Sequence, residues 1–177
     1  MSYRHQILGL AAATALLWTG CQSSSSSPTA PAQNGQLAIR ITDAPTDLLS
    51  ALDVYVAGVV VKLHGAPPVK VAGELGSYDI LQLHGTTRDL VASGVPAGRY
   101  DYVEVDLDAA RSDVVDRSTG KVLPLQISNA QIQVLGGFTV PADGALVVTL
   151  DFKADQSLEQ LPNGDWLLTP VIEATWN

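Results

Sequence analysis

The chain has 177 residues, with 18 Asp and Glu against 10 Lys and Arg, which gives a formal net charge of −8 at pH 7. An acidic surface repels phosphate backbones, so nucleic acid is not an expected partner. Because Cys21 is the only cysteine, an internal disulfide is excluded and the fold depends on its core alone.

Residues 1–20 have the pattern of a secretion signal. A short basic head with Arg4 precedes an apolar stretch over residues 7–18, which is shorter than the ~20 residues that span a bilayer. Small residues then lead to the cysteine in Leu17-Trp18-Thr19-Gly20-Cys21, and this stretch resembles the cleavage box of bacterial lipoproteins. Trp18 departs from that box, which usually has leucine at this position. The resemblance implies cleavage before Cys21 and attachment of a diacylglycerol and an N-acyl chain such as palmitate.

The following segment, 21–35, holds this cysteine and a stretch rich in Ser and Pro without apolar periodicity. We expect it to be a disordered tether that reaches roughly 50 Å at ~3.5 Å per residue. Gln22 stands where an aspartate would signal inner-membrane retention in enterobacteria, and this favours the outer membrane. The expected location is the cell envelope, with the membrane as a partner through the N-terminal lipid.

Residues 36–177 have the size and pattern of one all-β domain. No helical period extends beyond about two turns, and only residues 47–52 suggest a short helical turn. Alternating apolar residues between breaks of Gly, Pro, Asn and Asp predict strands at 36–42, 54–63, 69–71, 78–83, 100–109, 113–116, 121–127, 131–135, 145–153 and 166–176. This pattern indicates a single Greek-key β-sandwich of about 7–9 strands.

Local features of these strands give further expectations. Apolar residues on both faces of 54–63 predict a central strand, and Ser118-Thr119-Gly120 predicts a hairpin turn. Pro170 marks an edge or a bulge in the last strand. The turn before the strand at 100–109 predicts a positive φ at Gly98 and a buried Tyr100.

Six short motifs follow one another along the domain. They are Thr42-Asp43-Ala44-Pro45, the Val-rich strand to Leu63, Tyr78 to Leu83, Pro96-Ala97-Gly98-Arg99-Tyr100, Asp151-Phe152 with Ser157, and Pro170-Val171-Ile172. In this order they resemble the bacterial lipoprotein family called domain of unknown function 4382, over essentially all of residues 36–175. Lys153 departs from the family, where a second acid is expected after Asp-Phe. The family label implies no activity.

The turn that contains Gly98 and Tyr100 carries a second resemblance. It is similar to turns of transthyretin-like (prealbumin-like) sandwiches, in which Gly-x-Tyr starts a core strand. The resemblance implies a seven- or eight-stranded Greek-key sandwich, and a shared fold does not imply a shared function.

The usual enzyme signatures are absent from the sequence. It has no Gly-x-Ser-x-Gly elbow, no His-Glu-x-x-His and no phosphate loop, and lipidation would leave no cysteine nucleophile. No cofactor is expected. His64 and His84 each follow Leu and precede Gly at a predicted strand end, so they could share a metal ion if both ends lie on one side of the sandwich. The alternative is that both are turn residues.

Acidic residues are the other weak candidates for a metal site. Glu104, Asp106 and Asp108 alternate with inward-facing residues and lie ~7 Å apart along one predicted strand face. A solvated face that discourages edge pairing is the alternative. Asp43 and Asp47 follow the first strand, and Asp43 is expected to accept a backbone N–H in a turn.

Three hypotheses for function remain open. The tether, the sandwich pattern and the missing catalytic constellation favour a lipid-anchored β-sandwich of the cell envelope with a binding or structural role, whose ligand is an envelope protein or a glycan. The second hypothesis is an envelope metal-dependent hydrolase that uses His64 and His84. The third is a glycan-binding module, for which Tyr102 with Trp166 or Trp176 would supply the aromatic platform.

Overall fold

The computed structural model describes residues 33–44 and 46–177, which form an all-β sandwich of two sheets. The predicted signal peptide, Cys21 and most of the predicted tether lie outside the described residues. The smaller sheet has four strands in the order β13-β10-β1-β4. In it β1 (Asn34–Ala44) runs parallel to β10 (Ala145–Lys153) and antiparallel to β4 (Arg88–Pro96), and β13 (Ile172–Trp176) is antiparallel to β10.

The larger sheet has nine strands around the long strand β2 (Leu49–Leu63). One edge of β2 pairs with β3 (Val69–Asp79), and the other pairs in succession with β6 (Asp113–Asp116) and β5 (Gly98–Leu107). The remaining strands are β7 (Val122–Ile127), β8 (Gln131–Leu135), β9 (Thr139–Val140), β11 (Leu158–Gln160) and β12 (Trp166–Leu168). The predicted central position of residues 54–63 is confirmed.

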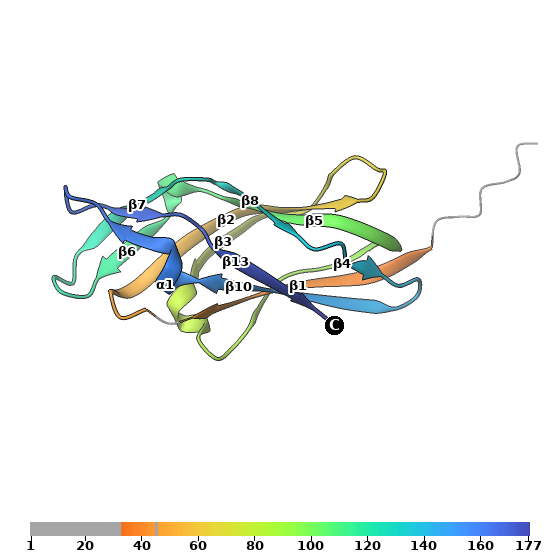
Figure 1. Ribbon diagram of the computed structural model, residues 1–177, viewed down its shortest axis with the longest axis horizontal. Coiled ribbons are helices and arrows are strands. Elements are labelled where there is room, and N and C mark those ends of the chain that lie inside the picture. The colour runs from red at the N-terminus through yellow and green to blue at the C-terminus, as the bar shows by residue number, and fades with distance from the viewer. Residues whose placement is uncertain (1–32, 45) are drawn as a thin grey trace, which may run out of the picture. The chain divides into compact units, whose positions relative to one another are not determined.

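The described residues also contain three short helical turns: η1 (Ile80–Leu83), η2 (Ala109–Arg111) and α1 (Ala154–Ser157). None of the described helices is long and apolar enough to cross a membrane. Figure 1 shows β1, β10 and β13 in one layer and β2, β5 and β8 in the other.

The core lies between the two sheets and is built by period-two alternation. Strands β1, β5 and β10 turn inward the residues that the alternation predicts. All are at least nine-tenths buried: Leu37, Ile39, Ile41, Val103, Val105, Leu107, Leu146, Val148, Leu150 and Phe152. Burial of such apolar area is the main driving force for folding, so these strands form around the predicted apolar rows. The strand predicted at 100–109 begins at Gly98 and ends at Leu107, because Asp108 caps η2.

The number of strands is larger than predicted, because the described residues contain 13 strands in place of about 7–9. The sequence pattern missed β4, whose Ala92, Ser93 and Gly94 look like loop residues, and the short strands β9 and β11. Strand β4 forms because it pairs with β1, a contact between residues that are 47 (Ile41 and Arg88) to 62 (Asn34 and Pro96) positions apart. Strand β1 also begins at Asn34, two residues before the predicted start of the domain.

Two predicted elements have a different secondary structure. Residues 47–52 form no helix, because β2 already begins at Leu49 and pairs there with β6. Residues 78–83 were predicted as one strand, but β3 ends at Asp79 and η1 follows. The Asp79 carboxylate accepts the Leu81 N–H at 3.2 Å, which caps η1 and ends the strand. The hairpin turn at Ser118-Thr119-Gly120 is confirmed, with Gly120 at φ +66°.

The last predicted strand, 166–176, is in fact two strands in different sheets. Strand β12 pairs in the larger sheet and β13 in the smaller one, and Pro170 lies between them. Ser157 holds this crossing: its hydroxyl donates to the Lys153 carbonyl at 2.6 Å and accepts the Val171 N–H at 3.0 Å. Its backbone carbonyl accepts the Thr169 N–H at 2.8 Å. The buried Ser157 therefore fixes the point at which the chain changes layers.

Replacing Ser157 by alanine is expected to lower the free energy of unfolding by ~1–3 kcal/mol, because the partly buried Val171 N–H loses its acceptor, the buried Ser157 hydroxyl. Urea unfolding followed by circular dichroism measures the change. The control is Thr169→Ala at the same joint, which removes an exposed side chain and keeps the backbone bond, with an expected change within ~0.5 kcal/mol. Equal losses for both variants would contradict the role of the Ser157 hydroxyl.

Candidate functional site

An apolar cavity of about 300 Å³ lies between the β2–β3 hairpin and strand β4. Its walls include Val61 and Leu63 of β2, Val71 of β3, Val95 of β4 and Tyr100 of β5. In the described residues β3 pairs with β2 and β4 pairs with β1, so no strand pairing closes this side of the sandwich. The cavity is therefore open where the edge strands β3 and β4 lie next to each other without hydrogen-bonded pairing.

A small residue at a core position leaves space in this cavity. Ser93 pairs with the buried Leu37 and shares the inner face of β4 with Val91 and Val95, which are also buried. A Leu or Val would be typical of such a position, whereas the serine side chain is small. The cavity continues along the inner face of β4 because this one position is not filled.

Tyr100 forms the floor of the cavity without offering it a polar atom. The side chain is 1% exposed, and its hydroxyl donates to the Pro96 carbonyl at 2.8 Å. Burial raises the pKa of Tyr100 above its ordinary value, so the hydroxyl stays protonated as a donor. Gly98 has φ +146°, as the approaching turn requires. The predicted burial of Tyr100 and positive φ of Gly98 are both confirmed.

The two candidate metal-binding histidines lie at opposite ends of β1. The backbone N–H of His64 donates to the Arg99 carbonyl, and the ring Nδ1 lies 2.9 Å from the Asp101 carboxylate. This turn is near the start of β1, where Asn34 pairs with Pro96. His84 forms a bridge with Asp43 at the other end of this eleven-residue strand. At ~3.3 Å per residue the two ends are roughly 30 Å apart, too far for the two rings to share a metal ion. Positive φ falls on the glycines that follow them, at +76° and +68°.

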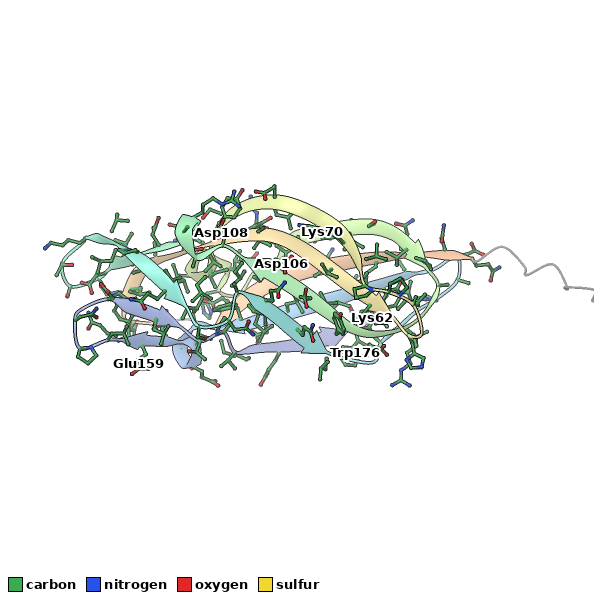
Figure 2. All side chains as sticks on the ribbon, turned by 90° about the horizontal axis from the view of Figure 1, so that it is seen from above. Lys62, Lys70, Asp106, Asp108, Glu159 and Trp176 are labelled. Carbon is green, nitrogen blue, oxygen red and sulfur yellow. The ribbon has the colours of Figure 1, made fainter. Side chains whose placement is uncertain are left out.

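The predicted row of acids is only partly present. Glu104 and Asp106 lie on the outer face of β5, with Gln133 and Gln131 at 2.6 and 3.5 Å. Asp108 leaves the row: it caps η2 through the Ala110 N–H and contacts Arg111. Figure 2 shows Asp106 and Asp108 along this surface. Among the described residues, no group of three or more His, Cys, Asp and Glu side chains could hold a metal ion.

The remaining sequence candidates do not converge either. Asp43 is buried and its carboxylate accepts the Ala154 N–H at 3.2 Å, a partner in α1, whereas Asp47 is exposed. Trp166 is 3% exposed and lies in the core. Trp176 packs against Phe138 with ring centroids 6.3 Å apart, and Tyr102 lies in the row of Glu104. The structure brings none of these aromatic residues together as a flat exposed pair.

The family of the chain follows from a comparison with family models. The model described as "Domain of unknown function (DUF4382)" matches residues 34–170. The chain belongs to the DUF4382 family. No curated protein and no solved structure matches it. The matched residues of this DUF4382 domain begin with β1 and include the whole cavity, whereas β13 lies beyond their end.

Lys153, where a second acid was expected after Asp-Phe, lies beside two carboxylates of the smaller sheet. Asp151 and Glu173 pair directly across β10 and β13, which places two carboxylates side by side. The Lys153 ammonium contacts Asp151 and lies 3.4 Å from Glu173. The hydrogen bond to Asp151 and the charges of both acids raise the pKa of Lys153. Lys153 therefore compensates a pair of like charges on the smaller sheet.

Tyr55, Glu74, Asp108 and Arg111 form a polar cluster on the outer face of the larger sheet, and sequence reasoning missed it. The Arg111 guanidinium lies 3.6 Å from the centroid of the Tyr55 ring and bonds Glu74 and Asp108 at 2.8 and 2.6 Å. The Tyr55 hydroxyl also donates to Glu74 at 2.8 Å. Arg111 and then Tyr55 lower the pKa of Glu74, and the bond to Glu74 raises the pKa of Tyr55. The cluster fastens η2 over β2 and β3, and no local sequence pattern signals it.

Three carboxylates lie side by side across the larger sheet. Asp53 of β2 pairs directly with Asp79 of β3 on one edge and with Asp113 of β6 on the other. Partial burial and then the charges of Asp79 and Asp113 raise the pKa of Asp53. Like charges that face each other across strands destabilise a sheet, so this row lowers the stability of the domain at neutral pH.

We expect Asp53→Asn to raise the free energy of unfolding at pH 7 by ~0.5 kcal/mol, or Tm by about 1–2 °C. Because the folded-state pKa of Asp53 is raised, the folded state binds a proton first as the pH falls. The gain in stability of Asp53→Asn is therefore present above the folded-state pKa of Asp53. It disappears below about pH 4, where the carboxyl group is protonated in both states. Calorimetry over this pH range measures it. Asp47→Asn, at an exposed carboxylate outside the row, is the control, and a gain that persists at pH 3 would contradict the explanation.

Proposed function

We propose that this DUF4382 protein is a lipid-anchored β-sandwich of the cell envelope that binds a ligand, with lipid attached to Cys21. The observation that carries the proposal is the sequence of the first 21 residues: a basic head, an apolar stretch too short to span a bilayer, and small residues before the only cysteine. Two or more acyl chains hold a protein stably on a membrane, whereas one chain holds it marginally. Gln22 supports the outer membrane as the location.

A binding role is supported by the cavity beside β4. Small-molecule sites in proteins are concave and mostly apolar, with volumes of about 300 to 1,000 Å³, and the volume of this cavity is about 300 Å³. The anchor would keep such a binding domain at the membrane surface. We also propose a transthyretin-like arrangement of the core strands, supported by the turn at Gly98 that leads into the buried Tyr100.

The proposal is tested on the wild-type chain produced in a bacterium with an outer membrane. Growth with labelled palmitate, followed by intact mass measurement, is expected to show label on the protein and a mass that corresponds to an acylated chain from residue 21 onward. Separation of the inner and outer membranes then measures the location. An unlabelled protein with a free Cys21 thiol would overturn the anchor.

A further inference from the structure

We infer that the cavity between the β2–β3 hairpin and β4 binds the hydrocarbon chain of a fatty acid, whose carboxylate stays at the rim near Lys70. This inference rests on the proposed binding role and names the class of ligand. The cavity residues, the open side of the sandwich and the local charge support it together.

The interior of the cavity suits hydrocarbon because it offers almost no hydrogen-bonding partner. Its walls are side chains of Val, Leu, Ala and Pro, with Tyr100 at the floor and Ser93 on β4. The Tyr100 hydroxyl already bonds the Pro96 carbonyl, and the Ser93 hydroxyl lies 3.4 Å from the Gly94 carbonyl. A sugar or peptide placed here would lose its hydrogen bonds to water without replacement, which is costly. A saturated chain has none to lose.

The mouth of the cavity is apolar as well. Val69 is 56% exposed although it belongs to strand β3 and lines the cavity. Exposed apolar surface that continues into a concavity is typical of ligand-binding grooves. A chain that enters between β3 and β4 would cover Val69 and contact Val71 and Val95 behind it. The geometry thus admits one narrow apolar chain from the open side.

The charge at the rim is complementary to a carboxylate. The chain as a whole has a net charge of −8, yet no Asp or Glu lines the cavity, and Lys70 is the charged residue among the lining residues. In the structure its ammonium lies on the outer face of the hairpin, over Gly58, where it donates to the Ala57 carbonyl at 3.3 Å. Because β3 is an edge strand, the exposed Lys70 side chain can turn around this edge and exchange that long bond for a carboxylate at the rim. Figure 2 shows Lys70 and Lys62 on the hairpin that forms this wall. An anionic head is therefore favoured over a cationic one.

The test uses the full chain with Cys21→Ser, which cannot carry lipid on that residue, and the fluorescent fatty acid cis-parinaric acid. Titration is expected to give saturable binding at one site. Ser93→Phe fills the cavity from the inner face of β4 and is expected to weaken binding at least about tenfold. The matched control is Ala92→Phe, the neighbouring position on the exposed outer face, which leaves binding unchanged.

A second pair of measurements tests the head group. Lys70→Ala is expected to weaken binding of the fatty acid by about two- to fivefold, the size of an exposed ion pair, and high salt reduces this difference. Binding of the corresponding fatty alcohol, which has no charge, is expected to be the same for both proteins. If the alcohol and the acid bind equally well and Lys70→Ala changes neither, the assignment of the head group is overturned.

Thermal unfolding confirms that each variant is folded before binding is compared. If Ser93→Phe does not fold, Ala66→Trp fills the cavity from the partly exposed β2–β3 turn instead. No saturable binding to the Cys21→Ser chain, or equal binding after the cavity is filled, overturns the inference. Neither result affects the palmitate experiment on the wild-type chain, so a failure of the ligand and a failure of the anchor are distinguishable.

Discussion

Replacing Cys21 by serine is expected to abolish palmitate labelling and to move the protein from the detergent phase to the aqueous phase in detergent partitioning. Lipid attachment requires the thiol, and the chain has no second cysteine to replace it. At ~0.8 kcal/mol for each buried CH₂ group, loss of the acyl chains removes most of the affinity for the membrane. This is the largest effect we expect from any single substitution.

The control for this experiment is Ser23→Ala, two residues further along the proposed tether, which leaves the thiol in place. It is expected to label and partition like the wild-type protein. Circular dichroism of the Cys21→Ser chain is expected to match that of the wild type, because the described domain begins at residue 33. A Cys21→Ser chain that still takes up palmitate would show that the anchor lies elsewhere.

Replacing Gly98 by alanine is expected to lower the free energy of unfolding by ~2 kcal/mol, because the backbone conformation at φ +146° strains an L-residue. A Cβ at this position would also lie 3.0 Å from Cδ1 of Leu63, a wall of the cavity. For a domain of this size the change corresponds to a loss in Tm of roughly 4–8 °C. Urea and thermal unfolding measure both quantities.

Two other glycines separate the backbone strain from the contact with Leu63. Gly65 has φ +76° with nothing within 4 Å of an added Cβ, so Gly65→Ala tests positive φ alone, at an expected ~1 kcal/mol. Gly94 has no positive φ, and its nearest contact would lie at 3.6 Å, so Gly94→Ala is expected to change stability by less than ~0.5 kcal/mol. If Gly98→Ala changes the free energy of unfolding as little as Gly94→Ala does, the backbone at Gly98 is not strained by an L-residue.

The ordered motifs around Asp43, Gly98 and Ser157 identified the family from the sequence, and the structure shows what two of them do. Gly98 permits the turn into the buried Tyr100. Ser157 forms a hydrogen bond with the Val171 N–H at the point where the chain crosses from one sheet to the other. The fold does not bring the candidate metal-binding residues together. His64 and His84 share a tripeptide in the sequence, but identical local sequence says nothing about which end of a sheet each strand end reaches.

The sequence by itself determined the strands whose inner face is a regular apolar row. Leu37, Ile39 and Ile41 alternate with polar residues, and this period of two specifies both the strand and its buried face without reference to any partner. The hairpin turn at Gly120 and the turn at Gly98 were predictable for the same reason, because turn chemistry depends on adjacent residues.

Only the tertiary structure decided the features that depend on distant partners. Ser93 interrupts the inner row of β4 between Val91 and Val95, and the strand exists through its pairing with β1. The split of residues 166–176 between two sheets depends on Ser157, and the separation of the histidines depends on the direction of β1. The cavity beside Ser93 arises where two unpaired sheet edges meet. Such contacts join residues tens of positions apart, and no local period or turn signal encodes them.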